Sequence, residues 1–118
     1  MTAEASRFTD VERAWTPLYA GAITPRPYGD SVTYRLGASF LGSLPVEDWG
    51  CGPGWFKRYA IGPCRGIDGS RTPAVDTVVD LRHYRSSTPG LFMRHVLEHN
   101  HSWQSVFDNA LASFQEKR

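Results

Sequence analysis

Three alternating glycines, at positions 50, 52 and 54, constrain the fold of this chain more than any other feature of its sequence. They lie in the run Asp48-Trp49-Gly50-Cys51-Gly52-Pro53-Gly54, directly after a short predicted strand and before a predicted helix. Glycines at such a place allow the chain to turn sharply off the strand, and they allow the backbone to approach a ligand closely. Because glycine and proline also dominate ordinary turns, the run alone leaves both interpretations open.

Helices and strands are predicted to alternate along the chain. Apolar residues at every fourth position predict one face of a helix over residues 31–44, capped by Asp30 or Ser31, and these residues are Val32, Leu36, Phe40 and Leu44. Apolar residues three and four apart predict a second, amphipathic helix, and these are Trp103, Val106, Phe107, Ala110, Leu111 and Phe114.

Short strands are predicted over residues 45–48, 65–68, 75–79 and 91–94, and a short helix over residues 55–59. This alternation predicts an α/β fold with a mostly parallel, doubly wound sheet. The chain has 118 residues, which suits one domain. We assign residues 1–30 to an irregular N-terminal lead-in, interrupted by proline and glycine, and residues 31–118 to a single domain.

Charge and targeting signals narrow the class of partner. Thirteen basic and twelve acidic residues give a formal net charge of +1, which argues against a dedicated nucleic-acid binder and favours a small-molecule partner. The first thirteen residues contain no apolar run, and no stretch approaches the ~20 apolar residues of a membrane span. We therefore expect neither a signal peptide nor a membrane partner.

The two cysteines, Cys51 and Cys64, form no CxxC pair, and no His/Cys cluster has the spacing of zinc ligands. We interpret both as reduced thiols of a cytoplasmic protein, although the sequence leaves a disulfide between them open.

Two further acidic residues follow the second and third predicted strands. Asp68 lies twenty residues after Asp48, the distance at which nucleotide-binding α/β units carry a ribose-binding carboxylate. Asp80 follows the third strand, where a carboxylate can accept a hydrogen bond from an adenine amino group. The alternatives are a solvated Asp68 in an Asp-Gly turn, and Asp80 as the cap of a helix starting at Leu81. Three acidic strand ends in series indicate an adenosyl ligand across the carboxyl edge of the sheet.

These motifs resemble those of the class I S-adenosylmethionine-dependent methyltransferases, over residues 34–114. The run over 48–54 resembles the first motif, residues 66–70 the acidic second motif, and residues 79–81 the third. Arg94-His95-Val96-Leu97-Glu98-His99 is similar to the stretch that follows the fourth strand in the branch of small-molecule and quinone methyltransferases. The resemblance implies a Rossmann-like three-layer sandwich. The family's sheet normally has seven strands, so this chain is expected to be truncated after the fourth strand and its helix.

The resemblance also implies a cofactor site for S-adenosylmethionine, whose product is S-adenosylhomocysteine. Asp48 would lie near the amino group of the methionine portion, beside the loop shaped by the three glycines. Asp68 would hold the ribose and Asp80 the adenine amino group. The remaining implied contacts are Leu81 packing on the adenine ring, the backbone of Arg94 and His95 near the reactive methyl, Tyr34 over the sulfonium, and Cys51, Gly69 and Ser70 in the two loops.

Candidate catalytic groups cluster after the fourth strand. We predict His95 as the base or acceptor-positioning group, because methyl transfer requires alignment and, for some acceptors, proton removal. The alternative, which the sequence favours for Glu98 and His99, is a polar cap and first turn before the last helix. A metal site on His95 and His99 is a weaker alternative and lacks a third placed ligand. The basic residues Arg82, Arg85 and Arg94 could hold an anionic acceptor or form a solvated face.

The sequence therefore predicts a methyltransferase acting on a small-molecule acceptor. Two alternatives remain open: a non-catalytic S-adenosylmethionine-binding module or partner subunit, and an enzyme that degrades S-adenosylmethionine. The fourth strand, with Leu91, Phe92 and Met93, would lie at a sheet edge, which proteins cover or pair. We therefore expect a homodimer or other oligomer that covers this edge or the face of the last helix.

Overall fold

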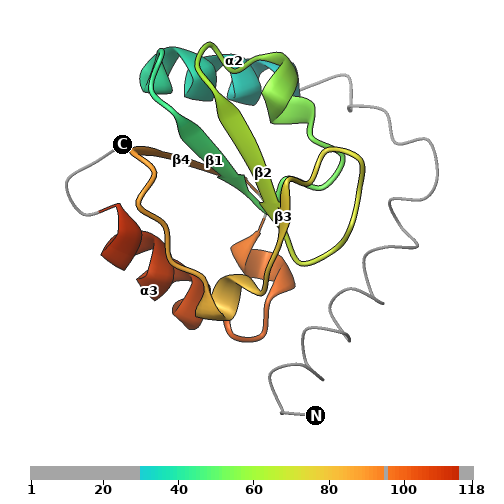
Figure 1. Cartoon of the computed structure of the whole chain (residues 1–118), viewed down its shortest axis with the longest axis vertical. Coiled ribbons are helices and arrows are strands. Elements are labelled where there is room, and N and C mark those ends of the chain that lie inside the picture. The colour runs from blue at the N-terminus through green and yellow to red at the C-terminus, as the bar shows by residue number, and fades with distance from the viewer. Residues whose placement is uncertain (1–29, 95, 115–118) are drawn as a thin grey trace.

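The computed structural model describes residues 30–94 and 96–114, in which the predicted helices and strands occur in the predicted order (Figure 1). The predicted lead-in lies outside the described residues except for Asp30, and so do His95 and residues 115–118. The longer elements are helix α2 (Asp30–Leu41), strands β1 (Val46–Trp49), β2 (Cys64–Asp68), β3 (Thr77–Val78) and β4 (Gly90–Met93), and helix α3 (Trp103–Ser113). Three short 3-10 helices lie between them: η1 (Trp55–Arg58), η2 (Leu81–His83) and η3 (Leu97–His99).

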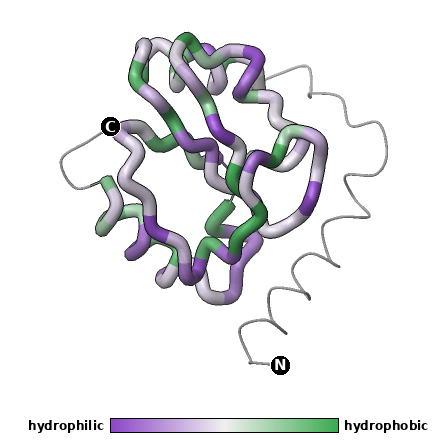
Figure 2. The backbone as a smooth tube through the Cα atoms, viewed as in Figure 1, coloured by the Kyte–Doolittle hydropathy of each residue, from purple (hydrophilic) through white to green (hydrophobic). Residues whose placement is uncertain are grey.

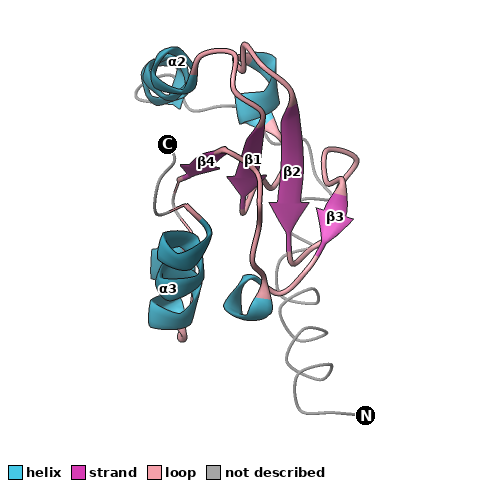
Figure 3. Cartoon of the chain, turned by 60° about the vertical axis from the view of Figure 1, so that its left-hand side comes forward, coloured by secondary structure: helices cyan, strands magenta, loops and turns pink. Residues whose placement is uncertain are grey.

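The four strands form one open sheet in the order β3-β2-β1-β4, and every pair is parallel (Figure 3). The register places Asp48 of β1 between Gly66 of β2 and Phe92 of β4. This confirms the predicted α/β class and parallel sheet. Because the strands are parallel, their carboxyl ends lie at one edge of the sheet, where such sheets bind ligands. Among the described strands β4 pairs only with β1, so it is an edge strand as predicted.

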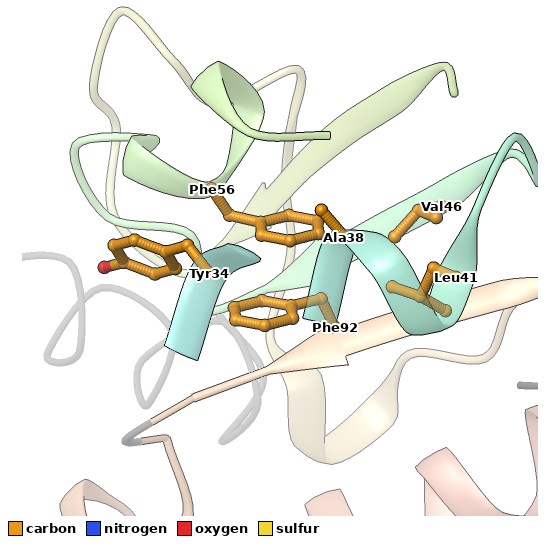
Figure 4. Packing of buried hydrophobic residues seen from close by; sticks show 6 residues of the cluster. All are labelled: Tyr34, Ala38, Leu41, Val46, Phe56 and Phe92. Atoms are coloured by element: carbon orange, nitrogen blue, oxygen red, sulfur yellow. The ribbon is translucent and has the colours of Figure 1, made fainter. Parts of the chain in front are cut away.

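Helix α2 covers one face of the sheet. The buried residues of α2 are Tyr34, Ala38 and Leu41. They pack in one apolar cluster against Val46, Phe56 and Phe92 (Figure 4). The rings of Phe56 and Phe92 are parallel, with centroids 3.9 Å apart. A Cβ atom at Gly37 would lie 2.6 Å from the Phe92 ring, so this close approach of α2 to β4 requires glycine.

Helix α3 covers the opposite face (Figures 1 and 3). The second cluster consists of Trp49, Ile67, Leu81, Val96, Val106 and Ala110. Trp49 lies at its centre and is fully buried, with Tyr84 and Phe114 in edge contact at centroid distances of 5.5 and 5.7 Å. The two helices therefore make three layers with the sheet between them.

The predicted apolar face of the first helix is wrong. Val32, Leu36 and Phe40 are 58, 67 and 65% exposed, while Leu44 lies beyond the end of α2. The buried residues of α2 are Tyr34, Ala38 and Leu41, at spacings of four and three, which follow one face of a 3.6-residue helix better than strict fours do. In α3 the prediction is half right, because Val106 and Ala110 are buried whereas Trp103, Phe107 and Leu111 are exposed.

Element ends also differ from prediction. Helix α2 stops at Leu41 because Gly42 adopts φ +59° and donates its N–H to the carbonyl of Ala38. Both proposed capping residues, Asp30 and Ser31, are part of the helix itself. The helix predicted over 55–59 is a 3-10 helix, and the third strand has only two residues.

None of the described helices is long and apolar enough to cross a membrane. Along the described backbone hydrophilic and hydrophobic residues alternate at short intervals, as the amphipathic elements of a layered fold require (Figure 2).

Candidate functional site

The glycine-rich loop leaves the carboxyl end of β1 through three left-handed residues. Gly50, Gly52 and Gly54 have φ values of +72, +50 and +83°, which favour glycine. Two of them also lie against other parts of the chain. A Cβ atom at Gly50 would be 2.4 Å from Val96, and one at Gly54 would be 2.3 Å from the Cβ of Ala74. Internal packing and backbone conformation thus account for Gly50 and Gly54 without a ligand.

The central peptide of the loop is held from both sides. The N–H of Gly52 donates to Oδ2 of Asp68 at 2.8 Å, and its carbonyl accepts from Oγ1 of Thr72 at 2.7 Å. The first and second predicted motifs are therefore in direct contact. Thr72 was not predicted from the sequence, because it has no distinctive spacing and follows the second motif by two residues.

Asp68 is the acceptor around which this contact forms. Its Oδ1 accepts the N–H of Ser70 at 2.9 Å, and its side chain is buried rather than solvated, so the alternative of a solvated Asp-Gly turn is wrong. Burial raises the pKa of Asp68, while N–H donors of Gly52, Ser70 and Gly69 oppose that rise. The two carboxylate oxygens together have four acceptor positions, so with three backbone donors one position remains for a hydroxyl group such as that of a ribose.

Asp48 is the most unusual side chain of the site. It is 4% exposed, and none of the described residues donates a hydrogen bond to its carboxyl group. Burial raises the pKa of Asp48 to about 8, the negative charge of Asp68 adds to the rise, and Lys57 lowers it. A buried carboxyl group without donors is costly to ionise, and such groups are candidates for functional positions.

The described groups around Asp48 form their hydrogen bonds elsewhere. Lys57 donates instead to the carbonyl of Ala74 at 2.8 Å and to Oδ2 of Asp76 at 2.6 Å. Cys51 and Cys64 are free thiols. Burial is the main cause that raises the pKa of both, and the negative charge of Asp48 is the second. Both thiols are therefore neutral at physiological pH.

Unlike Asp48, Asp80 has hydrogen-bond donors within the chain. It caps η2 by accepting the N–H of Arg82 at 3.0 Å, and its carboxylate forms an ion pair with the guanidinium of the same residue. Burial raises the pKa of Asp80, but the donors of Arg82 outweigh it and the pKa lies below its usual range. The capping alternative is therefore what the structure shows. Leu81, predicted to pack on adenine, is buried in the α3-side cluster.

The ring of Tyr34 already carries a cation. The guanidinium of Arg94 lies 5.3 Å from its centroid, and Tyr59 stacks on it at 5.5 Å. An external sulfonium at this ring would compete with Arg94.

The other predicted polar residues have internal contacts or lie on the surface. Arg85 donates to Oδ1 of Asn109, and Glu98 and His99 are exposed in η3. The predicted base, His95, lies outside the described residues, so its role stays a prediction. Within residues 30–94 and 96–114 no three His, Cys, Asp or Glu side chains are grouped to hold a metal ion.

Comparisons of the chain with protein-family models, curated proteins and solved structures find no match. The site is thus defined by its own geometry, in which β1, the glycine loop and the end of β2 bring together Asp48, Gly52, Asp68 and Ser70.

Proposed function

We propose that the chain binds S-adenosylmethionine at the carboxyl edge of a Rossmann-like sheet and transfers its methyl group to a small-molecule acceptor. The observation that carries this proposal is the buried Asp48 carboxyl group, which has no donor among the described residues and lies beside the glycine loop. The ammonium group of an amino acid is a donor of matching charge and size.

The second support is that the two acidic residues, Asp48 and Asp68, lie at the ends of neighbouring strands. Asp68 holds the loop through Gly52 and retains one acceptor position for a ribose hydroxyl. Asp48 and Asp68 lie on adjacent strands, so one ligand carrying both an ammonium group and a ribose can reach both. S-adenosylmethionine has this combination, and when bound it supplies an electrophilic methyl group on a sulfonium centre.

The chain's own contribution would be binding and alignment. Asp48 and Asp68 would orient the two ends of the ligand, the loop peptides would exclude water from it, and the acceptor would approach from the carboxyl end of β4. We propose His95 as the group that positions or deprotonates the acceptor. Because Cys51 and Cys64 are free thiols, a reducing compartment such as the cytoplasm suits the protein.

Calorimetric titration with S-adenosylmethionine and with S-adenosylhomocysteine tests the proposal. We expect both to bind, and we expect Asp68→Ala to weaken binding by roughly 1–3 kcal/mol, the cost of hydroxyl groups left without acceptors. Asp68→Asn serves as a second variant if the alanine variant fails to fold, and Asp108→Asn, on the exposed surface of α3, is the matched control.

The possible results separate the candidate functions. Formation of S-adenosylhomocysteine only with an acceptor supports the methyltransferase. Binding without turnover indicates the non-catalytic module, and loss of the ligand without an acceptor indicates a degrading enzyme. Equal affinity in wild type and Asp68→Ala, with both folded, contradicts the proposed site.

We also propose that the chain forms a homodimer. Within the described sheet β4 has an unpaired edge, and α3 exposes Trp103, Phe107 and Leu111. A second copy could cover either surface. Light scattering that reports a monomer at micromolar concentration contradicts this.

A further inference from the structure

The environment of Asp48 determines which form of its carboxyl group the ligand-free protein holds. Four titratable groups face it: the thiols of Cys51 and Cys64, the carboxylate of Asp68 and the ammonium of Lys57. In the described part of the chain, α2 and β4 add no charged group to this set. Lys57 is engaged elsewhere, so the site contains two neighbouring carboxyl groups and no cation paired with Asp48.

The proton held by this carboxyl pair belongs on Asp48. Asp68 receives backbone donors from Gly52 and Ser70, which stabilise its ionised form. Asp48 receives none and is the more deeply buried of the two, with a pKa of about 8. Where the pair holds one proton, that proton therefore lies on Asp48, and Asp68 is the member that ionises first.

We propose that the site takes up its ligand by exchanging the proton of Asp48 for the ligand's ammonium group. The inference rests on the function proposed above. The O–H bond of the Asp48 carboxyl group breaks, its proton passes to the buffer, and the carboxylate accepts hydrogen bonds from the incoming ammonium. One proton is released for each ligand bound below the pKa of Asp48. By linkage, affinity for an ammonium-bearing ligand then rises about tenfold per pH unit and levels off near that pKa.

Calorimetry with S-adenosylhomocysteine, which carries the ammonium group but cannot donate a methyl group, tests the exchange. Titrations at pH 6 to 9, in two buffers of different ionisation enthalpy, count the protons released. We expect nearly one proton at pH 6.5 and a dissociation constant that falls about tenfold per unit from pH 6 to 7.5. The isosteric variant Asp48→Asn is expected to release none and to show no such fall.

Two controls isolate Asp48 from other titrating groups. The ligand's own α-amino group also titrates, but it does so identically with wild type and Asp48→Asn. 5′-Methylthioadenosine, which lacks the amino-acid portion, is expected to bind without proton release. If Asp48→Asn does not fold, a carbon-13 NMR titration of wild type replaces it, with the Asp48 carboxyl carbon titrating near pH 8 in the free protein and no longer doing so when the site is filled.

The outcomes distinguish this inference from the proposed function. If S-adenosylhomocysteine binds without proton release, and with the same pH profile in wild type and Asp48→Asn, the exchange is overturned and the binding function stands. If neither nucleoside binds at any pH, both are overturned.

Discussion

Glu47 and Asp48 are neighbours on β1 and are equally buried at 4% exposure, yet their side chains lie on opposite faces of the sheet. On the α3 face, Glu47 accepts hydrogen bonds from Nε1 of Trp49, from the hydroxyl of Tyr84 and from Oγ1 of Thr88, each at 3.0 Å at its shortest. On the α2 face, Asp48 accepts none from the described residues. Glu47 joins β1 to the segment before β4, whereas Asp48 has no hydrogen-bond donor among the described residues.

This contrast separates a carboxylate that stabilises the fold from a carboxyl group that we propose binds a ligand. A buried carboxylate with several donors acts as a structural link, because its charge is compensated by polar groups of the fold. A buried carboxyl group without donors lowers stability when it ionises, and such a cost is typical of functional sites. The predictions below test this difference between the two faces.

The largest effect is expected from Asp48→Asn on the pH dependence of unfolding. The pKa of Asp48 is raised from 3.8 to about 8 in the folded chain, so its contribution to stability is complete below about pH 4 and is lost as the pH rises to about 8. Chemical unfolding from pH 4 to 9 should show wild type losing up to about 5 kcal/mol relative to Asp48→Asn, an upper limit because a buried site relaxes around a charge.

The control for this measurement is Asp108→Asn, which changes an exposed carboxylate on α3. Its stability profile should run parallel to that of wild type. Parallel profiles for Asp48→Asn as well would show that Asp48 has an ordinary pKa, and the contrast with Glu47 would lose its basis.

Glu47→Gln should destabilise the chain by about 2–4 kcal/mol at pH 7, the opposite sign to Asp48→Asn. The amide removes the charge that strengthens three hydrogen bonds, and it places an N–H₂ group against the donors of Trp49, Tyr84 or Thr88. Urea unfolding followed by tryptophan fluorescence measures the change. A loss below about 1 kcal/mol would show that these bonds contribute little and that Glu47 is no structural link.

Much of this architecture was predictable from the sequence, because glycine turns and apolar runs are local signals. The order of elements and the parallel sheet follow from alternation, and the contact between the glycine loop and Asp68 follows from strand adjacency. The hydrogen-bonding states of Glu47 and Asp48 were not predictable. They depend on Tyr84 and Thr88, which lie 37 and 41 residues from Glu47, and on the absence of such donors on the other face.

The buried faces of the helices were harder to predict for a related reason. The apolar pattern of α2 contains two stripes, one through Leu36 and Phe40 and one through Ala38 and Leu41, and periodicity alone does not say which meets the sheet. Phe92 and Gly37 decide it, because only at Gly37 can the helix approach the ring so closely.

The smallest effect on folding is expected at the exposed stripes, where Leu36→Ser in α2 and Leu111→Ser in α3 should each change the free energy of unfolding of the monomer by no more than about 0.5 kcal/mol. The two helices should differ in association. If α3 is the face that a second copy covers, Leu111→Ser weakens the dimer in sedimentation equilibrium and Leu36→Ser leaves it unchanged. The reverse result would assign the contact to the exposed side of α2. Equal, negligible effects of both variants on a dimer would instead leave the edge of β4 as the contact.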